Sequence, residues 1–402
     1  MNKKIAKGLV QVGIYLLVFI VIQIVVMQVV GICSLLAQGF NASEIVTRMT
    51  DGSMLWEMSS MDDLPKILGN SDPIHYTQML PGIGTNAEYQ SGIHIQGCDN
   101  SHNIVSINGV PLYNVNHLLG FFSIFNASHF STLNIRKSLY DVSTANRLGG
   151  GLDMETNDNI PDSTNGEFAL GLISSQGTLR TPLGRRTSMT LSLRGSYINM
   201  LYGSWLKADN TQIEYSFYDC NFTLCHHIDD RNTVTIDFYA GNDTGNLNES
   251  SYLSDNALKW GNVMGSLRWK HHGHGFNVNQ TIYSTYYHNK FMLTMQDNNY
   301  ALKSSNMDLG YKGNITAGRW DIGLDAVWHN IQPQYLDNNN TYNVTSGNPE
   351  RQYSSEASAF VRYSLHLRKH STMIFGARAT LYSADGNHFG SADPSLAFMY
   401  DN

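Results

Sequence analysis

The sequence predicts a mainly β protein, in which a small α+β domain precedes an antiparallel β-barrel of the outer-membrane kind. Three observations support this fold class. Apolar and polar residues alternate with period two through most segments after residue 165. Short and long connections alternate between those segments. The composition, with 35 Gly and 22 Tyr against only 9 Pro, suits many strands joined by turns.

The N-terminal segment reads as a targeting signal. Lys3, Lys4 and Lys7 precede an apolar run from Leu9 to Leu36. A basic region followed by an apolar core is typical of a secretory signal peptide, which we predict over residues 1–37. An uncleaved transmembrane anchor is the alternative, because the run is long enough to span a bilayer.

The alternation is clearest in the segment "NTVTIDFYA". Val234, Ile236 and Phe238 share one face of the expected strand, and Thr235 and Asp237 share the other. Such a sheet can belong to a soluble sandwich, which hides its apolar face, or to a membrane barrel, which turns that face to lipid. Strict alternation of short turns with long polar links, such as those expected at Met292–Ser304 and Ala384–Asp393, favours the barrel. We count about eleven strands and part of a twelfth.

The segment from residue 61 to 158 carries a family resemblance. Its motifs are "LPKILGNSDP", "QMLPGIGTNAE", the stretch Gly92–Asn126, "LNIRKS" and "RLGGGLDMETND". Together they resemble the plug domain of TonB-dependent outer-membrane receptors of the Bacteroidetes type. The resemblance implies a linker over 38–60, the plug over 61–158 and a partial barrel over 165–402. Since plugged receptor barrels have about 22 strands, the expected 11–12 indicate a C-terminally truncated receptor.

Thirteen residues match the plug motifs and are expected to act structurally: Pro81, Gly82, Gly97, Asn108, Gly109, Tyr113, Asn114, His117, Gly120, Phe121, Phe122, Arg147 and Leu148. The residues alone already predict a hairpin at Asn108-Gly109, because a type I′ turn needs positive φ at both central positions. Asn108 stands where the family usually has Asp, which changes the turn little. Gln96 and Cys98 replace the usual Arg and Gly.

The resemblance also implies a function, the uptake of a scarce nutrient such as a siderophore, glycan, peptide or vitamin across the Gram-negative outer membrane. The implied partners are the TonB-ExbB-ExbD complex, outer-membrane lipid, the small nutrient ligand and a partner lipoprotein. TonB would pair as an added strand with a TonB box, which requires extended, unpaired backbone. The candidate is "SEIVTRMT", with Glu44, Ile45, Val46 and Thr47 at its centre. An unstructured spacer is the alternative.

No catalytic, metal or cofactor site is expected. The chain lacks a G-x-S-x-G elbow and a paired-carboxylate arrangement. His271, His272 and His274 fall in an expected short turn, where a functional metal site is disfavoured. The net charge of −7 indicates no nucleic-acid partner. Two other functions stay open: a truncated, non-transporting remnant or binding module that retains the plug, and an outer-membrane β-enzyme such as an esterase, which the missing nucleophile motif disfavours.

Overall fold

A computed structural model describes most of the chain after the N-terminal segment. The described residues are 46–49, 51–64, 66, 68–84, 92–137, 142–144, 147–204, 206–208, 211–249, 254–295, 298–338, 349–368 and 370–400. The expected signal peptide, Glu44 and Ile45 lie outside them. Among these described residues, no helix is both long and apolar enough to cross a membrane.

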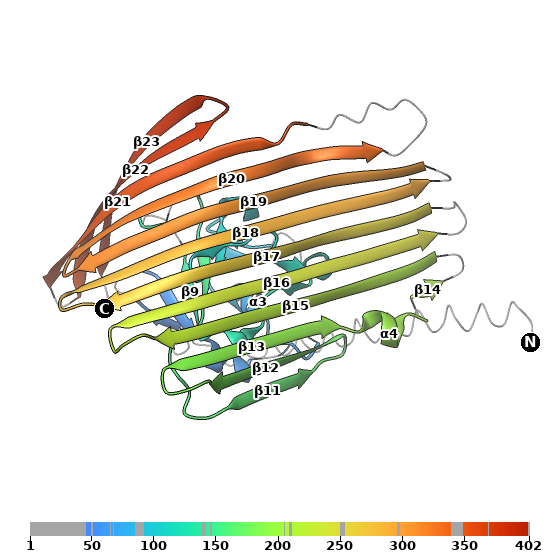
Figure 1. The fold of residues 1–402 in the computed structure, drawn as a ribbon, viewed down its shortest axis with the longest axis horizontal. Coiled ribbons are helices and arrows are strands. Elements are labelled where there is room, and N and C mark those ends of the chain that lie inside the picture. The colour runs from blue at the N-terminus through green and yellow to red at the C-terminus, as the bar shows by residue number, and fades with distance from the viewer. Residues whose placement is uncertain are drawn as a thin grey trace, which may run out of the picture.

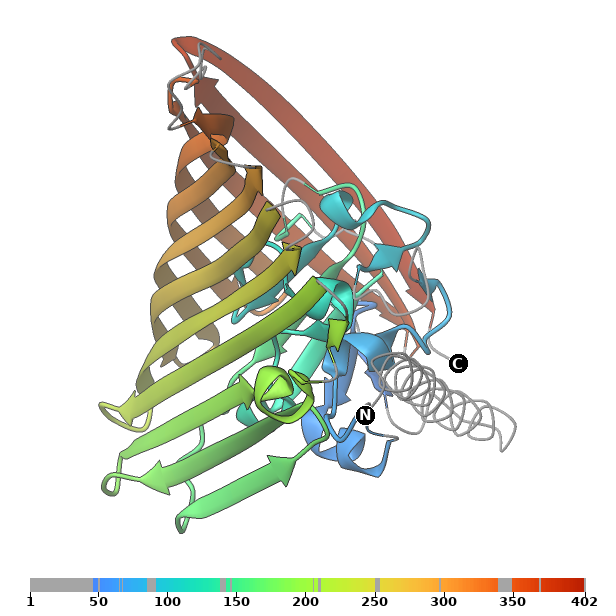
Figure 2. The same cartoon turned by 90° about the vertical axis from the view of Figure 1, so that its right-hand side faces the viewer.

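A curved outer sheet surrounds an inner domain, which we define as the described residues between 46 and 158. The inner domain lies on the concave side of the outer sheet (Figures 1 and 2). The larger cluster of buried apolar residues is shared between them: Trp56 and Leu133 of the inner domain join Tyr239 and Met264 of the outer sheet.

The inner domain is α+β, as expected. Its elements are β1 (Val46–Arg48), β2 (Met54–Glu57), η1 (Met58–Asp63), α3 (Pro73–Thr77), β3 (Ile83–Gly84), β4 (His94–Ile95), η2 (Asn100–His102), β5 (Ile104–Ile107), β6 (Val110–Pro111), β7 (Asn116–His117), η3 (Leu118–Gly120), β8 (Phe122–Ser123), η4 (Ala127–His129), β9 (Thr132–Arg136) and β10 (Gly151–Glu155). Helix α3 begins at Pro73, which suits the first helical turn. Asp72 caps the helix by accepting hydrogen bonds from the backbone amides of Ile74 and His75.

Six strands form the main sheet of the inner domain, in the order β1-β2-β9-β10-β5-β6. Only β10 and β5 pair in parallel; the other neighbours are antiparallel. Strands β1 and β2 precede residue 61, so this sheet includes residues that the sequence placed in the linker. The reason is burial, because Val46 and Trp56 lie opposite each other and both side chains are in the core.

The outer sheet follows the chain order. Its elements are β11 (Asn165–Leu170), β12 (Ser174–Pro182), β13 (Thr187–Ser196), α4 (Ile198–Tyr202), β14 (Lys207–Ala208), β15 (Thr211–His227), β16 (Asn232–Glu249), β17 (Ser254–His272), β18 (Phe276–Met295), β19 (Asn298–Ala317), β20 (Trp320–Asn338), β21 (Gln352–Arg368), β22 (Ser371–Ala384) and β23 (Asn387–Tyr400). Twelve strands pair in an antiparallel path from β11 to β23, and the short β14 pairs with β15. The described strands β11 and β23 form the two edges of an unclosed sheet. The predicted partial barrel is confirmed.

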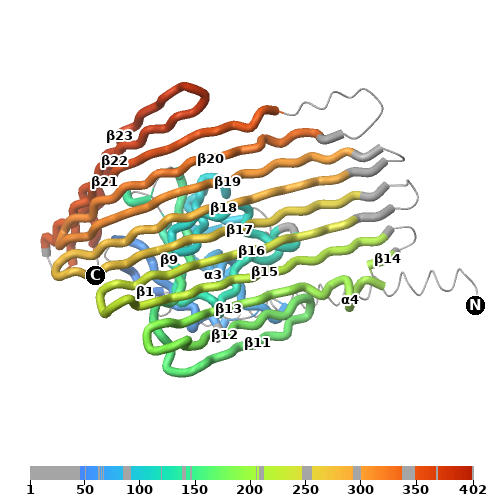
Figure 3. The backbone as a smooth tube through the Cα atoms, in the orientation of Figure 1, coloured from blue at the N-terminus to red at the C-terminus, as the bar shows by residue number. Residues whose placement is uncertain are grey.

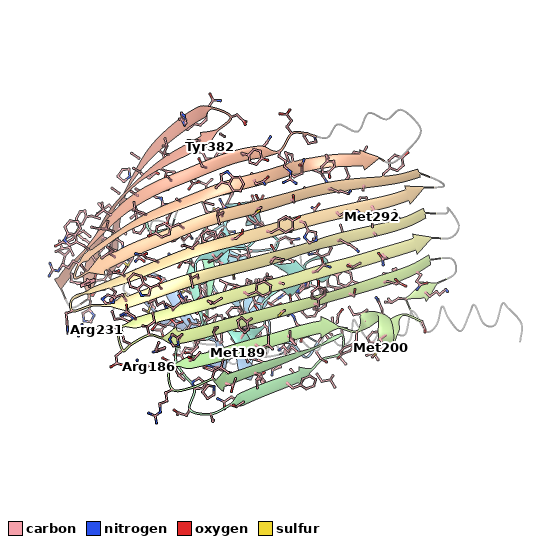
Figure 4. All side chains as sticks on the ribbon, viewed as in Figure 1. Arg186, Met189, Met200, Arg231, Met292 and Tyr382 are labelled. Atoms are coloured by element: carbon pink, nitrogen blue, oxygen red, sulfur yellow. The ribbon has the colours of Figure 1, made fainter. Side chains whose placement is uncertain are left out.

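The two faces of the outer sheet differ as the alternation predicted. On β16, Thr235 and Asp237 are buried toward the inner domain, whereas Ile236 and Phe238 are exposed. The short turns gather at one end of the strands, called here the turn end, and α4 and β14 lie at the other, the loop end (Figure 3). Figure 4 shows Arg186 and Arg231 at the turn end and Met200 and Met292 at the loop end.

Several connections at the loop end are shorter than expected. Strand β18 continues to Met295 and β19 begins at Asn298, within the expected long link Met292–Ser304. The expected link after Ala384 is a two-residue turn, with positive φ at Asp385 and Gly386. Where strands extend beyond the lipid, both of their faces contact water. The alternation of apolar and polar residues is then lost, while the hydrogen bonds between neighbouring strands continue.

Candidate functional site: the interface between the inner domain and the barrel wall

Polar side chains of the inner domain meet polar side chains on the concave face of the outer sheet. A polar cavity of about 380 Å³ lies between them. On the inner-domain side it is lined by residues of β5, β6, β9 and β10, and on the wall side by residues of β18 to β22. Burial here requires that donors and acceptors be paired, so the pairing pattern fixes the position of the inner domain.

The most buried contact is made by His117, at the end of β7. Its Nε2 lies 2.8 Å from both carboxylate oxygens of Asp219 on β15, and its Nδ1 lies 2.7 Å from a carboxylate oxygen of Asp243 on β16. The ring stacks on Phe217, with centroids 4.4 Å apart. Because a neutral imidazole has only one N–H, both contacts are hydrogen bonds only when His117 is protonated.

Further donors complete this buried cluster. Arg194 on β13 donates to Asp219 at 2.7 Å and to the backbone oxygen of Ser123 in the inner domain at 2.7 Å. Asp243 accepts from the hydroxyl of Tyr215 and from the backbone amide of Leu118. Two cations therefore face two carboxylates. Burial lowers the pKa of His117, but the Asp219 and Asp243 carboxylates outweigh burial, and the net pKa is raised.

A second contact holds the Asn108-Gly109 turn. The φ angles are 50° at Asn108 and 77° at Gly109, as the predicted type I′ hairpin requires. The Asn108 side-chain amide donates to Asp237 on β16 at 2.8 Å, and Lys312 Nζ on β19 donates to the Gly109 carbonyl oxygen at 2.5 Å. An Asp at position 108 could make the same turn but could not donate to Asp237. Asn rather than Asp at position 108 therefore matters for docking, although the choice between them changes the turn little.

Tyr113 and Asn114 make a third contact. The Tyr113 hydroxyl donates to Asp308 on β19 at 2.5 Å, and the other oxygen of Asp308 lies 2.7 Å from His329 Nδ1. Burial and the Asp308 carboxylate raise the pKa of Tyr113, so its hydroxyl remains a donor. The Asn114 backbone oxygen accepts from Asn262 at 3.3 Å.

The remaining predicted motif residues shape the inner domain itself. Gly82, Gly97 and Gly120 all have positive φ, which explains why glycine stands there. The Pro81 carbonyl oxygen accepts from Lys137 Nζ at 2.6 Å. Phe121 and Phe122 pack together with ring centroids 5.5 Å apart. Arg147 lines the cavity, whereas Leu148 is 81% exposed, away from the interface contacts.

The described part of the TonB-box candidate is already a strand. Val46 and Thr47 belong to β1, which pairs with β2 along one edge. The expected unpaired backbone is therefore not found on that side. The other edge of β1 has no partner among the described strands, because β1 ends the six-stranded sheet.

The wall residues of these contacts were not singled out from the sequence. Arg194, Asp219, Asp243, Asp308 and Lys312 each occupy an inward position of a strand. The only signal in the sequence was charge on the polar face of an alternating segment, as for Asp237. That signal does not say which inner-domain residue each charge meets.

Within the described residues, no group of three His, Cys, Asp or Glu side chains could hold a metal ion. The three turn histidines have separate contacts: His271 with Asn232, His272 with Asn277 and His274 with Arg231.

Comparison with solved structures gives strong similarity of fold. The siderophore receptor PirA from Acinetobacter baumannii matches with a TM-score of 0.61 at 13% identity over 87% of this chain and 59% of that one. A mutant of the ferric enterobactin receptor PfeA from Pseudomonas aeruginosa gives 0.62 at 13% identity, over 88% of this chain and 60% of that one. The outer-membrane transporter YddB from Escherichia coli gives 0.62 at 12% identity, over 87% and 59%.

Sequence comparisons add no relative: no protein-family model matches the chain, and no curated protein matches it significantly. The chain spans about 60% of the length of the matched structures. These structures are receptors and transporters rather than enzymes. The chain therefore has the fold of the TonB-dependent outer-membrane receptors, an inner domain seated in a partial outer-membrane barrel.

Proposed function

We propose that this chain acts in TonB-dependent uptake of a scarce nutrient across the outer membrane, with the inner domain as a plug. The observation that carries the proposal is the interface chemistry, above all His117 held between Asp219 and Asp243. Ionic and hydrogen-bonded contacts set the position of the plug. When the contacts open, water can solvate both sides, so release costs less than separating an equally large apolar interface.

Energy for release would come from TonB with ExbB and ExbD. Strand β1 supports this step, because it lies at an edge of the plug sheet and its next partner β2 pairs with β9 inside that sheet. A partner strand added along β1 would therefore pull directly on the sheet that carries the Asn108 hairpin, formed by β5 and β6. The nutrient class is open among siderophores, glycans, peptides and vitamins, and a surface lipoprotein is a further proposed partner.

Uptake in cells tests the proposal. Labelled candidate nutrients are offered to cells with the intact gene, with the gene deleted and with the TonB system disabled. Uptake should require both the gene and TonB. Uptake that is independent of TonB contradicts the proposal. A chain that reaches the outer membrane but supports no uptake of any candidate favours the non-transporting alternative.

Whether the chain forms a folded barrel in the outer membrane is tested separately. Outer-membrane fractions are analysed by electrophoresis with and without heating, since a folded barrel migrates differently from the unfolded chain. A heat-modifiable band should appear only in the outer-membrane fraction. Its absence contradicts a membrane-inserted barrel, whatever the uptake result.

A further inference from the structure

The short turns at the turn end carry exposed arginines, called here the arginine row. Arg185 and Arg186 lie in the turn between β12 and β13. Arg231 lies in the turn between β15 and β16, and Arg319 in the turn between β19 and β20. All four residues are exposed, and Figure 4 shows Arg186 and Arg231 at this end of the sheet. The protein as a whole has a net charge of −7, so the arginine row is a local exception.

Acidic residues near the row neutralise little of its charge. Arg186 Nη2 is 3.9 Å from Asp230 Oδ1, and the two side chains are 56% and 99% exposed. An ion pair so exposed to water is weak. The neighbouring Asp229 accepts hydrogen bonds from the backbone amides of Arg231 and Asn232, so it stabilises its own turn.

The other three arginines form no ion pair within the part of the chain that the structure describes. These are Arg185, Arg231 and Arg319. Arg231 Nη2 lies 2.6 Å from His274 Nε2, and since the acceptor there is a neutral ring nitrogen, the positive charge of Arg231 is not compensated. Each guanidinium has five N–H donors, so each of the three can bind an anion.

The height of Arg319 on the barrel identifies its surroundings. Trp320, the next residue, is 50% exposed on the outward face of β20, and Trp328 on the same face is 39% exposed. Ile322 and Leu324 lie between them and are exposed. Eight residues span about 26 Å along a strand, or about 20 Å along the membrane normal for a tilted strand, close to the apolar band of about 25 Å that aromatic girdles border in outer-membrane barrels. Trp320 therefore marks the edge of the band at the turn end, and Arg319 lies in the headgroup layer.

Two other turns place arginines at the same level. Leu183 and Ile228 are exposed apolar residues next to the ends of their strands. Arg185 follows Leu183, and Arg231 follows Ile228, within the same turn. The short turns of outer-membrane barrels face the periplasm. The arginine row therefore faces the headgroups of the periplasmic leaflet, which consists of phospholipid.

We propose that Arg185, Arg231 and Arg319 bind the headgroups of anionic phospholipids in the periplasmic leaflet. A guanidinium matches a phosphate with two parallel hydrogen bonds. Neighbouring hairpins of the sheet are two strand spacings, about 10 Å, apart, so the row holds lipids side by side. A headgroup with net negative charge is favoured over a zwitterionic one, whose own cation is repelled. The inference rests on the outer-membrane location, and it needs neither TonB nor a transported nutrient.

Binding is measured with the purified full-length chain in micelles of a zwitterionic detergent. The probes are phosphatidylglycerol and phosphatidylcholine with the same pyrene-labelled acyl chain, which accepts excitation energy from Trp. The wild type should bind phosphatidylglycerol more tightly than phosphatidylcholine. The combined variant Arg185→Gln, Arg231→Gln and Arg319→Gln should bind phosphatidylglycerol on the order of a hundredfold more weakly, since each arginine near an anionic surface contributes about fivefold. Replacing all three by Lys should retain most of the affinity, because the charge remains.

Two further variants separate local charge from total charge. Lys207→Gln, Lys259→Gln and Lys290→Gln together remove the same charge from β14, β17 and β18 near the loop end, and this matched control should bind phosphatidylglycerol as the wild type does. Asp230→Asn removes the carboxylate beside Arg186 and should tighten binding by about fivefold.

Unchanged affinity of the combined Gln variant, or equal affinity of the wild type for the two lipids, overturns the proposal. Unchanged or weaker binding by Asp230→Asn also contradicts it, and this test stands even if the Gln variant fails to fold. If inorganic phosphate displaces the labelled lipid at an equal concentration, the row is assigned to free phosphate instead. Loss of uptake with lipid binding intact would concern the transport proposal and not this one.

Discussion

Replacing His117 by Leu should loosen the docked inner domain without unfolding it. Leu fills much of the space but donates no hydrogen bond. Asp219 keeps Arg194 and Tyr239 as partners, whereas Asp243 is left with the Tyr215 hydroxyl and a backbone amide. One buried carboxylate thus loses its counter-ion. Breaking a buried ion pair on one side costs about 3–5 kcal/mol.

Hydrogen exchange by mass spectrometry measures this cost locally. Backbone amides of residues 116–123 should exchange about 10²- to 10⁴-fold faster in His117→Leu than in the wild type, provided that exchange follows local opening. Amides of β9 and β10, in the main sheet of the inner domain, should keep their wild-type protection. Faster exchange throughout the inner domain would indicate global unfolding instead.

A second substitution separates charge from packing. Adding Asp243→Asn to His117→Leu removes the carboxylate without a counter-ion and should restore most of the lost protection, whereas Asp243→Asn alone should weaken docking. The two effects should therefore be strongly non-additive. Additive effects, or unchanged exchange in His117→Leu, would refute the argument that a protonated His117 holds the inner domain in place.

Three further predictions follow from the same interface and its neighbours. The contribution of His117 to docking should be complete below its usual pKa of 6.5 and lost as the pH rises through its raised pKa in the docked state. The protection of residues 116–123, taken relative to the intrinsic exchange rate at each pH, should therefore fall at alkaline pH in the wild type but not in His117→Leu. Burial by itself raises the pKa of Asp72, but His75 and the backbone amide of Ser123 outweigh burial, so the pKa is lowered from 3.8 to about 2. Asp72→Asn should therefore lower the free energy of unfolding by about 2 kcal/mol above pH 4. The difference from the wild type should vanish as the pH falls through about 2. Asn108→Asp should speed exchange of residues 104–111 more than Asn108→Ala does at neutral pH, because a carboxylate would then face Asp237 where the amide now donates at 2.8 Å; equal rates would contradict this.

Much of the fold was predictable from local pattern. Alternation along segments such as the one around Asp237 identified the strands and their two faces, because the period of a strand is a local property. The Asn108-Gly109 turn was predictable for the same reason, since its positive φ angles depend on two residues. The loop end was predicted less well. Strand β18 continues through polar residues to Met295, and β19 begins at Asn298. Strands that pair outside the lipid do not need one apolar and one polar face, so the residue pattern does not reveal them.

What the sequence by itself determined is therefore the class of structure: a strand-rich wall with one apolar and one polar face, preceded by a compact turn-rich domain. Only the tertiary structure decided which charges meet. His117 lies 102 residues from Asp219 and 126 residues from Asp243 in the chain. Pairings over such distances are set by how the sheet curves around the inner domain, and a shift of one residue in register would turn each of these side chains to the other face.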